Sequence, residues 1–300
     1  MGIQSDGNLG FGQNKIPERT YLCPLCMKGF YESDLDQNKE NPLTLEDLPP
    51  KSIGNKLYIL TCKKCNNESG YNLDYLIKQQ LSIDPFLKGT INSGITANFN
   101  LGDNRYAKGK LNIIGEEQLH FDILSTSNQF LKTSFNRFIN DKSKAPFTIK
   151  YPIPNNQKLN LAYLRIGYLI FFNYFGYLAL FDKNLKMLRE QLSMVNDYEH
   201  TKVVIIRNLE NKNVSEGAYI IKAPEYLKAY LVIIKTTDKI TEKEIGIVIP
   251  GPGEEGLNCY NNFFLHKESN KIEMINVSYK DLISKIETID AYHTFYKDIN

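Results

Sequence analysis

The segment Cys23-Pro24-Leu25-Cys26 is followed, after 35 intervening residues, by Cys62-Lys63-Lys64-Cys65. Each Cys-x-x-Cys pair presents two sulfur atoms from one turn, and two such pairs supply the four ligands of a tetrahedral zinc ion. The fifth cysteine, Cys259, stands alone. Four unrelated buried thiols, or a redox-active pair at a helix start, explain this spacing less well. The sequence therefore predicts a structural zinc site formed by Cys23, Cys26, Cys62 and Cys65.

Composition and charge restrict the class of protein. Of the 300 residues, 42% are hydrophobic and 23% are charged, which is typical of a globular chain with a packed core. The net charge is only +2, so the protein as a whole does not attract nucleic acid or an anionic membrane, and any such contact must be local. The polar N-terminus lacks the basic and apolar regions of a secretory signal, and metal-binding cysteines suit a reducing compartment. We therefore expect a cytoplasmic protein.

The chain divides by composition into three parts. Residues 1–20 are rich in Gly, Asn and Gln, and we expect a flexible lead-in. Residues 21–85 contain the cysteines, and residues 86–300 form a larger body that could be split near residue 200. The insert between the two cysteine pairs is longer than the roughly 15 to 20 residues of a compact zinc ribbon, so it should form structure of its own. The fold class that we predict is α+β.

Alternating apolar residues and turn residues predict the elements of this fold. A strand at 56–61 should enter the second cysteine pair and a helix at 66–80 should leave it, which completes a zinc-stabilised ββα module. In the body, antiparallel strands are expected at 96–101, 110–114, 118–123, 146–151, 203–206, 218–221, 230–234, 245–249 and 262–265. Helices are expected at 125–141, 182–192 and 279–289.

The most apolar stretch of the chain, residues 161–181, is long enough to cross a membrane. Arg165 and Asn173 interrupt it, and an arginine near the middle of a single span costs about 2.5 kcal/mol or more. We therefore predict a buried helix in the core of the body and no membrane contact. Arg165 should form a buried ion pair inside the protein.

A further motif lies between the two cysteine pairs. It reads Glu46-Asp47-Leu48-Pro49-Pro50-Lys51-Ser52-Ile53-Gly54, and Asn66 follows the last cysteine. Together with the cysteines, this order resembles the zinc-bound form of the HNH, or ββα-metal, endonucleases over about 50 residues. Three later segments, at 162–169, 188–192 and 249–251, bear a fainter likeness to uncharacterised bacterial proteins described only as HNH endonucleases.

The resemblance implies a metal-dependent endonuclease that hydrolyses phosphodiester bonds of nucleic acid, with DNA as the favoured partner. It places Glu46 and Asn66 as ligands of a catalytic Mg²⁺ or Mn²⁺ ion, which stabilises the leaving oxygen. Asp47 takes the position of the histidine that acts as general base. Lysine side chains near the site would each contact one phosphate, and the candidates are Lys51, Lys56, Lys63 and Lys64. A solvated face around a structural zinc ion explains these lysines equally well.

Asp47 is a departure from the family pattern with a chemical consequence. The pKa of an aspartate is about 3.9, roughly three units below that of an efficient base at neutral pH, and a nearby cation lowers it further. Asp47 is therefore a poor general base and a good metal ligand. The alternative hypothesis is a catalytically inactive zinc-binding recognition or scaffold protein derived from an HNH module. Asp74, about two helical turns after Asn66, is interpreted as a solvated helix position, with support of a ligand as the alternative.

Overall fold

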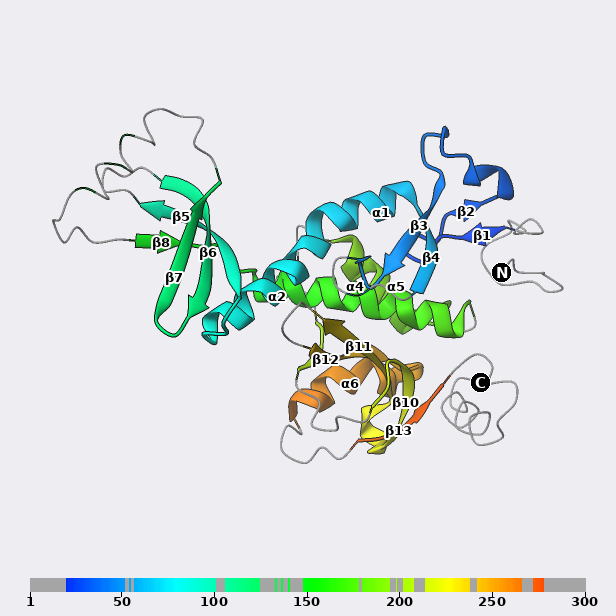
Figure 1. The fold of residues 1–300 in the computed structure, drawn as a ribbon. Helices are drawn as coiled ribbons and strands as arrows, with labels where there is room; N and C mark the ends of the chain where they lie inside the picture. Colours follow the sequence, from blue (N-terminus) through cyan, green and yellow to red (C-terminus); the bar gives the residue numbers. More distant parts are fainter. Residues whose placement is uncertain are drawn as a thin grey trace. The chain divides into compact units, whose positions relative to one another are not determined.

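The computed structural model describes residues 20–51, 54, 57–100, 106–124, 133, 136, 140, 148–177, 180–194, 198, 202–207, 214–237, 242–265 and 272–277. These residues form two compact units (Figure 1). The first combines residues of 1–75 with those of 156–237 and 242–300, and the second comprises residues of 76–155. Three expected segments lie outside the described residues. They are the lead-in except for Thr20, the helix at 279–289, and nearly all of the helix at 125–141.

The N-terminal part of the first unit is built from two antiparallel strand pairs. Strands β1 (Tyr21–Leu22) and β2 (Gly29–Phe30) flank the first cysteine pair. Strands β3 (Leu43–Leu48) and β4 (Leu57–Cys62) form a hairpin that leads into the second pair. The insert between the cysteine pairs contains β2, a 3-10 turn at Glu32–Leu35, β3 and nearly all of β4, so it forms structure of its own, as predicted.

A helical run follows the hairpin directly. Helix α1 (Lys63–Ser69) continues through one π-helical turn, Gly70–Asp74, into α2 (Tyr75–Leu87). The predicted helix at 66–80 is confirmed, and it is longer at both ends. A π-helical turn inserts an extra residue and shifts the helix face, and it marks functional sites in many proteins. Here the turn ends at Asp74, the residue that sequence analysis assigned to solvent.

The centre of the first unit is helix α4 (Asn156–Phe175). It contacts the β3–β4 hairpin and the π-helical turn as well as four strands of a larger sheet (Figure 1). The predicted buried helix is therefore confirmed, but it ends at Phe175 because Gly176 takes a positive φ of 58° and closes the helix. Helix α5 (Lys183–Ser193) follows, with Asp182 as its N-terminal cap. Within the described residues, no helix is sufficiently long and apolar to cross a membrane.

The larger sheet of the first unit has the strand order β13-β10-β11-β12-β9 and is antiparallel throughout. Its strands in chain order are β9 (Ile205–Arg207), β10 (Gly217–Ala223), β11 (Ala229–Thr237), β12 (Glu242–Pro250) and β13 (Glu273–Asn276). A 3-10 turn, Glu225–Leu227, connects β10 to β11. The predicted strands at 203–206, 218–221, 230–234 and 245–249 are confirmed with small shifts.

The strand predicted at 262–265 is wrong, because these residues end helix α6 (Gly253–Leu265). The buried residues of α6 are Gly256, Cys259, Tyr260 and Phe263, a spacing of three and four that follows one helix face. A run of four residues is too short to distinguish a strand from a helix by its period. The preceding turn is fixed by Asn184, whose side-chain amide donates hydrogen bonds of 2.7 Å to the carbonyls of Gly251 and Gly253.

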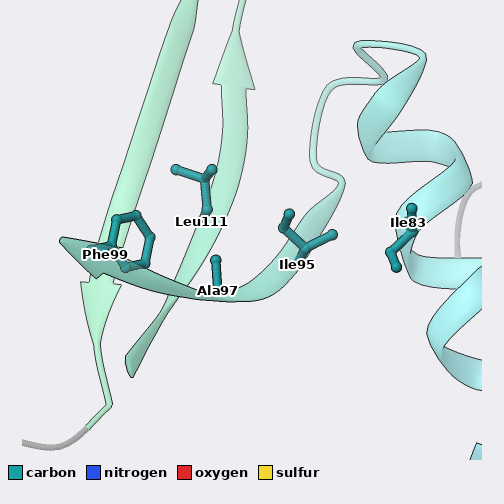
Figure 2. Close-up of a cluster of buried hydrophobic side chains, with 5 residues drawn as sticks. All are labelled: Ile83, Ile95, Ala97, Phe99 and Leu111. Atoms are coloured by element: carbon teal, nitrogen blue, oxygen red, sulfur yellow. The ribbon is translucent and has the colours of Figure 1, made fainter. Parts of the chain in front are cut away.

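The second unit contains a four-stranded antiparallel sheet in the order β7-β6-β5-β8. Its strands are β5 (Gly94–Asn100), β6 (Tyr106–Gly115), β7 (Gln118–Ile123) and β8 (Thr148–Lys150). The predicted meander is confirmed. Figure 2 shows its core, a cluster of buried side chains. The cluster consists of Ile95, Ala97 and Phe99 of β5, Leu111 of β6 and Ile83 of α2. The fold as a whole is α+β with antiparallel sheets and a four-cysteine cluster near the N-terminus.

Candidate metal centre

The four cysteines are brought together by the two strand pairs. Cys23 and Cys26 lie in the tight turn between β1 and β2, where Met27 adopts a positive φ of 58°. Cys62 is the last residue of β4 and Cys65 lies in the first turn of α1. The backbone N–H of Cys62 donates to the sulfur of Cys23 at 3.4 Å, which joins the two turns directly.

The sulfur positions fit one tetrahedral metal ion. The four Sγ atoms lie within 4.8 Å of one another, and those of Cys26 and Cys62 are 3.8 Å apart. A tetrahedral ion with metal–sulfur bonds of about 2.3 Å requires neighbouring sulfurs about 3.8 Å apart. Among the described residues, these cysteines are the only group of three or more His, Cys, Asp or Glu side chains whose ligand atoms lie close enough together to bind one metal ion. The cluster can therefore hold a metal ion such as zinc.

The thiol environment does not act alike on the four cysteines, because hydrogen bonds within the cluster raise the pKa of Cys23 and of Cys65. A hydrogen bond with Cys23 lowers the pKa of Cys26 to about 7, and a hydrogen bond with Cys23 also lowers the pKa of Cys62. A lowered pKa supplies the thiolate form, which is the form that ligates a metal. Cys23 and Cys62 are buried, whereas Cys26 and Cys65 are partly exposed. The cluster is therefore partly accessible to solvent at Cys26 and Cys65.

Tyrosine side chains fasten the cysteine turn to the body of the first unit. The hydroxyl of Tyr177 accepts from the N–H of Leu22 at 2.9 Å and donates to its carbonyl at 2.8 Å. The hydroxyl of Tyr168, on α4, donates to the carbonyl of Pro24 inside the turn at 2.7 Å. Tyr168 also accepts from Arg189 of α5 at 3.3 Å. The first cysteine turn is thus held against α4 by hydrogen bonds to its own backbone.

The hairpin separates the two acidic residues of the motif. Successive residues of a strand point to opposite faces, so Glu46 and Asp47 of β3 lie on different sides of the hairpin. Glu46 shares its face with Thr44 and with Thr61 of β4, and it is 6% exposed. Asp47 is partly exposed and lies opposite Tyr58, whose side chain is 57% exposed. The two carboxylates therefore do not meet at one point.

Asn66, the expected helix ligand, lies near the Glu46 face of the hairpin. Its amide nitrogen Nδ2 donates to Oγ1 of Thr44 at 3.1 Å. On the same face, the hydroxyl of Thr61 donates to Oε2 of Glu46 at 3.0 Å. Strands β3 and β4 and helix α1 thus follow one another in ββα order, with Glu46 and Asn66 linked to neighbouring threonines.

The remaining oxygen of Glu46 faces a buried arginine. Nη2 of Arg165, on α4, lies 2.5 Å from Oε1 of Glu46, and Nη1 lies 3.7 Å from Oδ1 of Asp74. Arg165 is 1% exposed, so its charge lies against these carboxylates with little screening by water. The buried ion pair predicted for Arg165 is confirmed, and the solvated position predicted for Asp74 is wrong.

Burial and the arginine act in opposite directions on these carboxylates. Burial raises the pKa of Glu46, while the charge of Arg165 and the hydrogen bond from Thr61 lower it. The pKa of Asp74 is also raised by burial and lowered by Arg165, with the rise prevailing. Arg165 therefore offsets only part of the cost of burying two acids.

Three of the four lysines assigned to phosphate contacts are among the described residues, and all three are exposed. Lys63 and Lys64 begin α1 and are exposed, and Lys51 is exposed after the hairpin strand β3. Lys64 also lies 3.9 Å from Glu68 one helical turn on, a pair between exposed groups that contributes little. Lys56 lies outside the described residues.

Sequence reasoning missed Thr61 and the role of Asp74. The alternation of β4 could have placed Thr61 on the Glu46 face, because it lies two residues beyond the buried Ile59. No local pattern marks Asp74, because the π-helical turn changes its direction.

The chain matches no protein-family model, no curated protein and no solved structure.

Proposed function

We propose that this is a zinc-binding protein in which an HNH-like hairpin and helix serve as a rigid recognition scaffold and do not hydrolyse phosphodiesters. The observation that carries the proposal is the contact between Arg165 and Glu46, the carboxylate that the resemblance assigns to the catalytic ion. A buried guanidinium already neutralises that carboxylate. All five cysteines are free thiols, which is consistent with a protein that functions in the reducing cytoplasm.

Electrostatics opposes a second metal ion at Glu46. A divalent ion on this carboxylate would lie about 4 Å from the guanidinium and be repelled by about 8 kcal/mol at the effective dielectric constant of a protein. Asp47 lies on the other face of the hairpin and cannot share the ion. The zinc site instead would contribute on the order of 10 kcal/mol of folding energy, which holds the module together without chemistry.

The alternative is an HNH-type endonuclease, and one observation favours it. Strands β3 and β4 and helix α1 follow in ββα order, and Asn66 and Glu46 each bond a threonine on one face of the hairpin. Activity of this kind requires Mg²⁺ or Mn²⁺ to displace Arg165 from Glu46. Nucleic acid, DNA in preference, remains the proposed partner under both hypotheses, with Lys51, Lys63 and Lys64 exposed near the module.

Incubation of the full chain with plasmid, single-stranded DNA and RNA in Mg²⁺ or Mn²⁺ distinguishes the two. We expect one zinc ion per chain by elemental analysis, no cleavage, and no calorimetric signal for a second divalent ion. The matched variants are Asp47→Asn and Asn66→Ala, neither of which removes a member of the ion pair between Arg165 and Glu46. Cleavage by the wild type that is lost in either variant would establish the endonuclease and reject the scaffold.

A further inference from the structure

The four-stranded sheet of the second unit has one face without a covering element among the described residues. Even-numbered residues of β5, β6, β7 and β8 share this face, because Asn98 pairs with Lys108 on one side and with Lys150 on the other. We call this the outer face. Odd-numbered residues such as Phe99 and Leu111 point into the core with Ile83 of α2 (Figure 2).

The outer face is polar and basic. Lys108, Lys110 and Lys150 are all exposed on it, and Lys108 and Lys150 flank the exposed Asn98 in one row across three strands. The acid that the described strands contribute to this face is Asp122, which lies opposite Lys110 on the neighbouring strand. It lies 3.5 Å from His120 and accepts from Asn112 at 3.3 Å. The row that contains Asn98 therefore carries two positive charges and no carboxylate.

An aromatic ring lies beside this row. Tyr106 pairs with Asn100 across the strands and is 38% exposed. Nζ of Lys150 lies 4.8 Å from the centre of the Tyr106 ring, a cation–π distance that orients the ring next to a positive charge. Proteins that bind single strands combine basic groups for the backbone with aromatic rings on which bases stack.

We propose that the outer face of this sheet binds single-stranded nucleic acid. Lys108, Lys110 and Lys150 would contact phosphates, a base would stack on Tyr106, and the amide of Asn98 would meet a base edge. Four strands about 4.8 Å apart give a face roughly 14 Å wide, which suits a few unstacked nucleotides. A duplex hides its bases from a broad sheet, so a single strand is the ligand that uses the ring and the amide.

The outer face is a second site, and binding there does not depend on whether the hairpin module hydrolyses phosphodiesters. The probe is a fluorescein-labelled single-stranded oligonucleotide of about a dozen residues, titrated with the full zinc-loaded chain and followed by anisotropy at several salt concentrations. Mg²⁺ and Mn²⁺ are omitted, so cleavage cannot enter the measurement. Failure of the oligonucleotide to bind would reject the site on the outer face and would not affect the proposal for the hairpin module. A cleavage result would in turn not affect the proposal for the outer face.

The decisive variant is Lys108→Gln combined with Lys150→Gln. We expect affinity to fall at least about tenfold and the slope of log K against log salt to shrink by about 1.4, because each phosphate contact to a single strand contributes about 0.7. The matched control is Lys78→Gln with Lys88→Gln, which removes two exposed lysines of the same unit from α2 and its end. This control should bind as the wild type does.

Tyr106→Leu tests the stacking contact separately. It should weaken binding about fivefold or more while leaving the salt slope unchanged, because the ring carries no charge. Several results would overturn the proposal: no binding of the single strand near 50 mM salt, equal losses in the two double-lysine variants, or a duplex of the same sequence bound as tightly. Binding to phosphatidylserine vesicles without binding to the oligonucleotide would replace nucleic acid by a membrane surface as the partner.

Discussion

Nη2 of Arg165 lies 2.5 Å from Oε1 of Glu46, although the first residue belongs to helix α4 and the second to strand β3. Both side chains are almost completely buried, and the nearby Asp74 adds a second carboxylate at 3.7 Å. The pair joins the hairpin of the cysteine module to the central helix of the first unit. The position that the resemblance gives to a metal ion is therefore next to a fixed positive charge.

Replacing the arginine should destabilise the first unit strongly. Arg165→Met leaves the buried Glu46 and the half-buried Asp74 without a counter-charge, and loss of one partner of a buried pair costs about 3 to 5 kcal/mol. Urea unfolding monitored by tyrosine fluorescence measures the change. Arg207→Met, at an exposed arginine that bonds Asn160, is the control and should change stability by less than about 0.5 kcal/mol. Equal effects of the two substitutions would contradict this role of the pair.

The destabilisation by Arg165→Met should depend on pH. Burial raises the pKa of Glu46 and of Asp74, and the arginine opposes both rises, so its removal raises both pKa values further. An acid with a raised pKa in the folded state contributes stability that is present below its unfolded pKa of about 4 and is lost as pH rises through the folded pKa. The deficit relative to wild type should therefore grow as pH rises above about 4 and be larger near pH 8 than near pH 5.

Unfolding curves of the wild type and the variant at both pH values provide the measurement. The double variant Arg165→Met with Glu46→Gln is the control, because it removes one of the two acids. Its deficit should vary less with pH than that of Arg165→Met alone. A deficit of the same size at both pH values would mean that neither carboxylate changes its charge in this range.

The sequence predicted those features that depend on local spacing. Two Cys-x-x-Cys pairs indicated the cluster, and alternation indicated strands β5 to β7 and most of the larger sheet. The sequence predicts a strand at 262–265 because four residues are too few to show helical spacing of apolar side chains. That spacing becomes visible only when Cys259 and Tyr260 are included.

The partners of Arg165 could not be predicted from the sequence. A buried charge in an apolar helix requires a counter-charge, but Glu46 and Asp74 are far away in the chain and approach only after α4 packs on the hairpin. The same packing explains why the motif alone did not reveal the contact. The spacing of the motif identified Glu46 as a possible metal ligand, whereas the packing of α4 determines that Arg165 lies beside it.

Loss of one cysteine ligand should remove the metal ion. Cys62→Ser leaves three sulfurs around the site, and we expect less than about a tenth of a zinc ion per chain by elemental analysis and a large loss of stability, since metal binding is coupled to folding. Cys259→Ala is the control, because this buried cysteine lies outside the cluster and should leave one zinc ion per chain. Full zinc content in Cys62→Ser would show that the ion is bound elsewhere.

The packing of α4 on the larger sheet depends on Gly167. A Cβ atom at this position would lie 2.5 Å from Cγ2 of Ile247 on β12, so no side chain fits without movement. Alanine is favoured over glycine in a helix by about 1 kcal/mol. Forcing a methyl group into a packed core costs about 1 to 3 kcal/mol, so Gly167→Ala should lower the free energy of unfolding.

Urea unfolding of Gly167→Ala, Ile247→Ala and the double variant tests this contact. Ile247→Ala removes the atoms that clash, so the double variant should be less destabilised than the sum of the two single variants, by about 0.5 to 3 kcal/mol. Asn173→Ala, at an exposed position of the same helix, controls for helix propensity and should be neutral or slightly stabilising. Strict additivity would mean that α4 and β12 adjust independently, because only a shared contact couples the two residues.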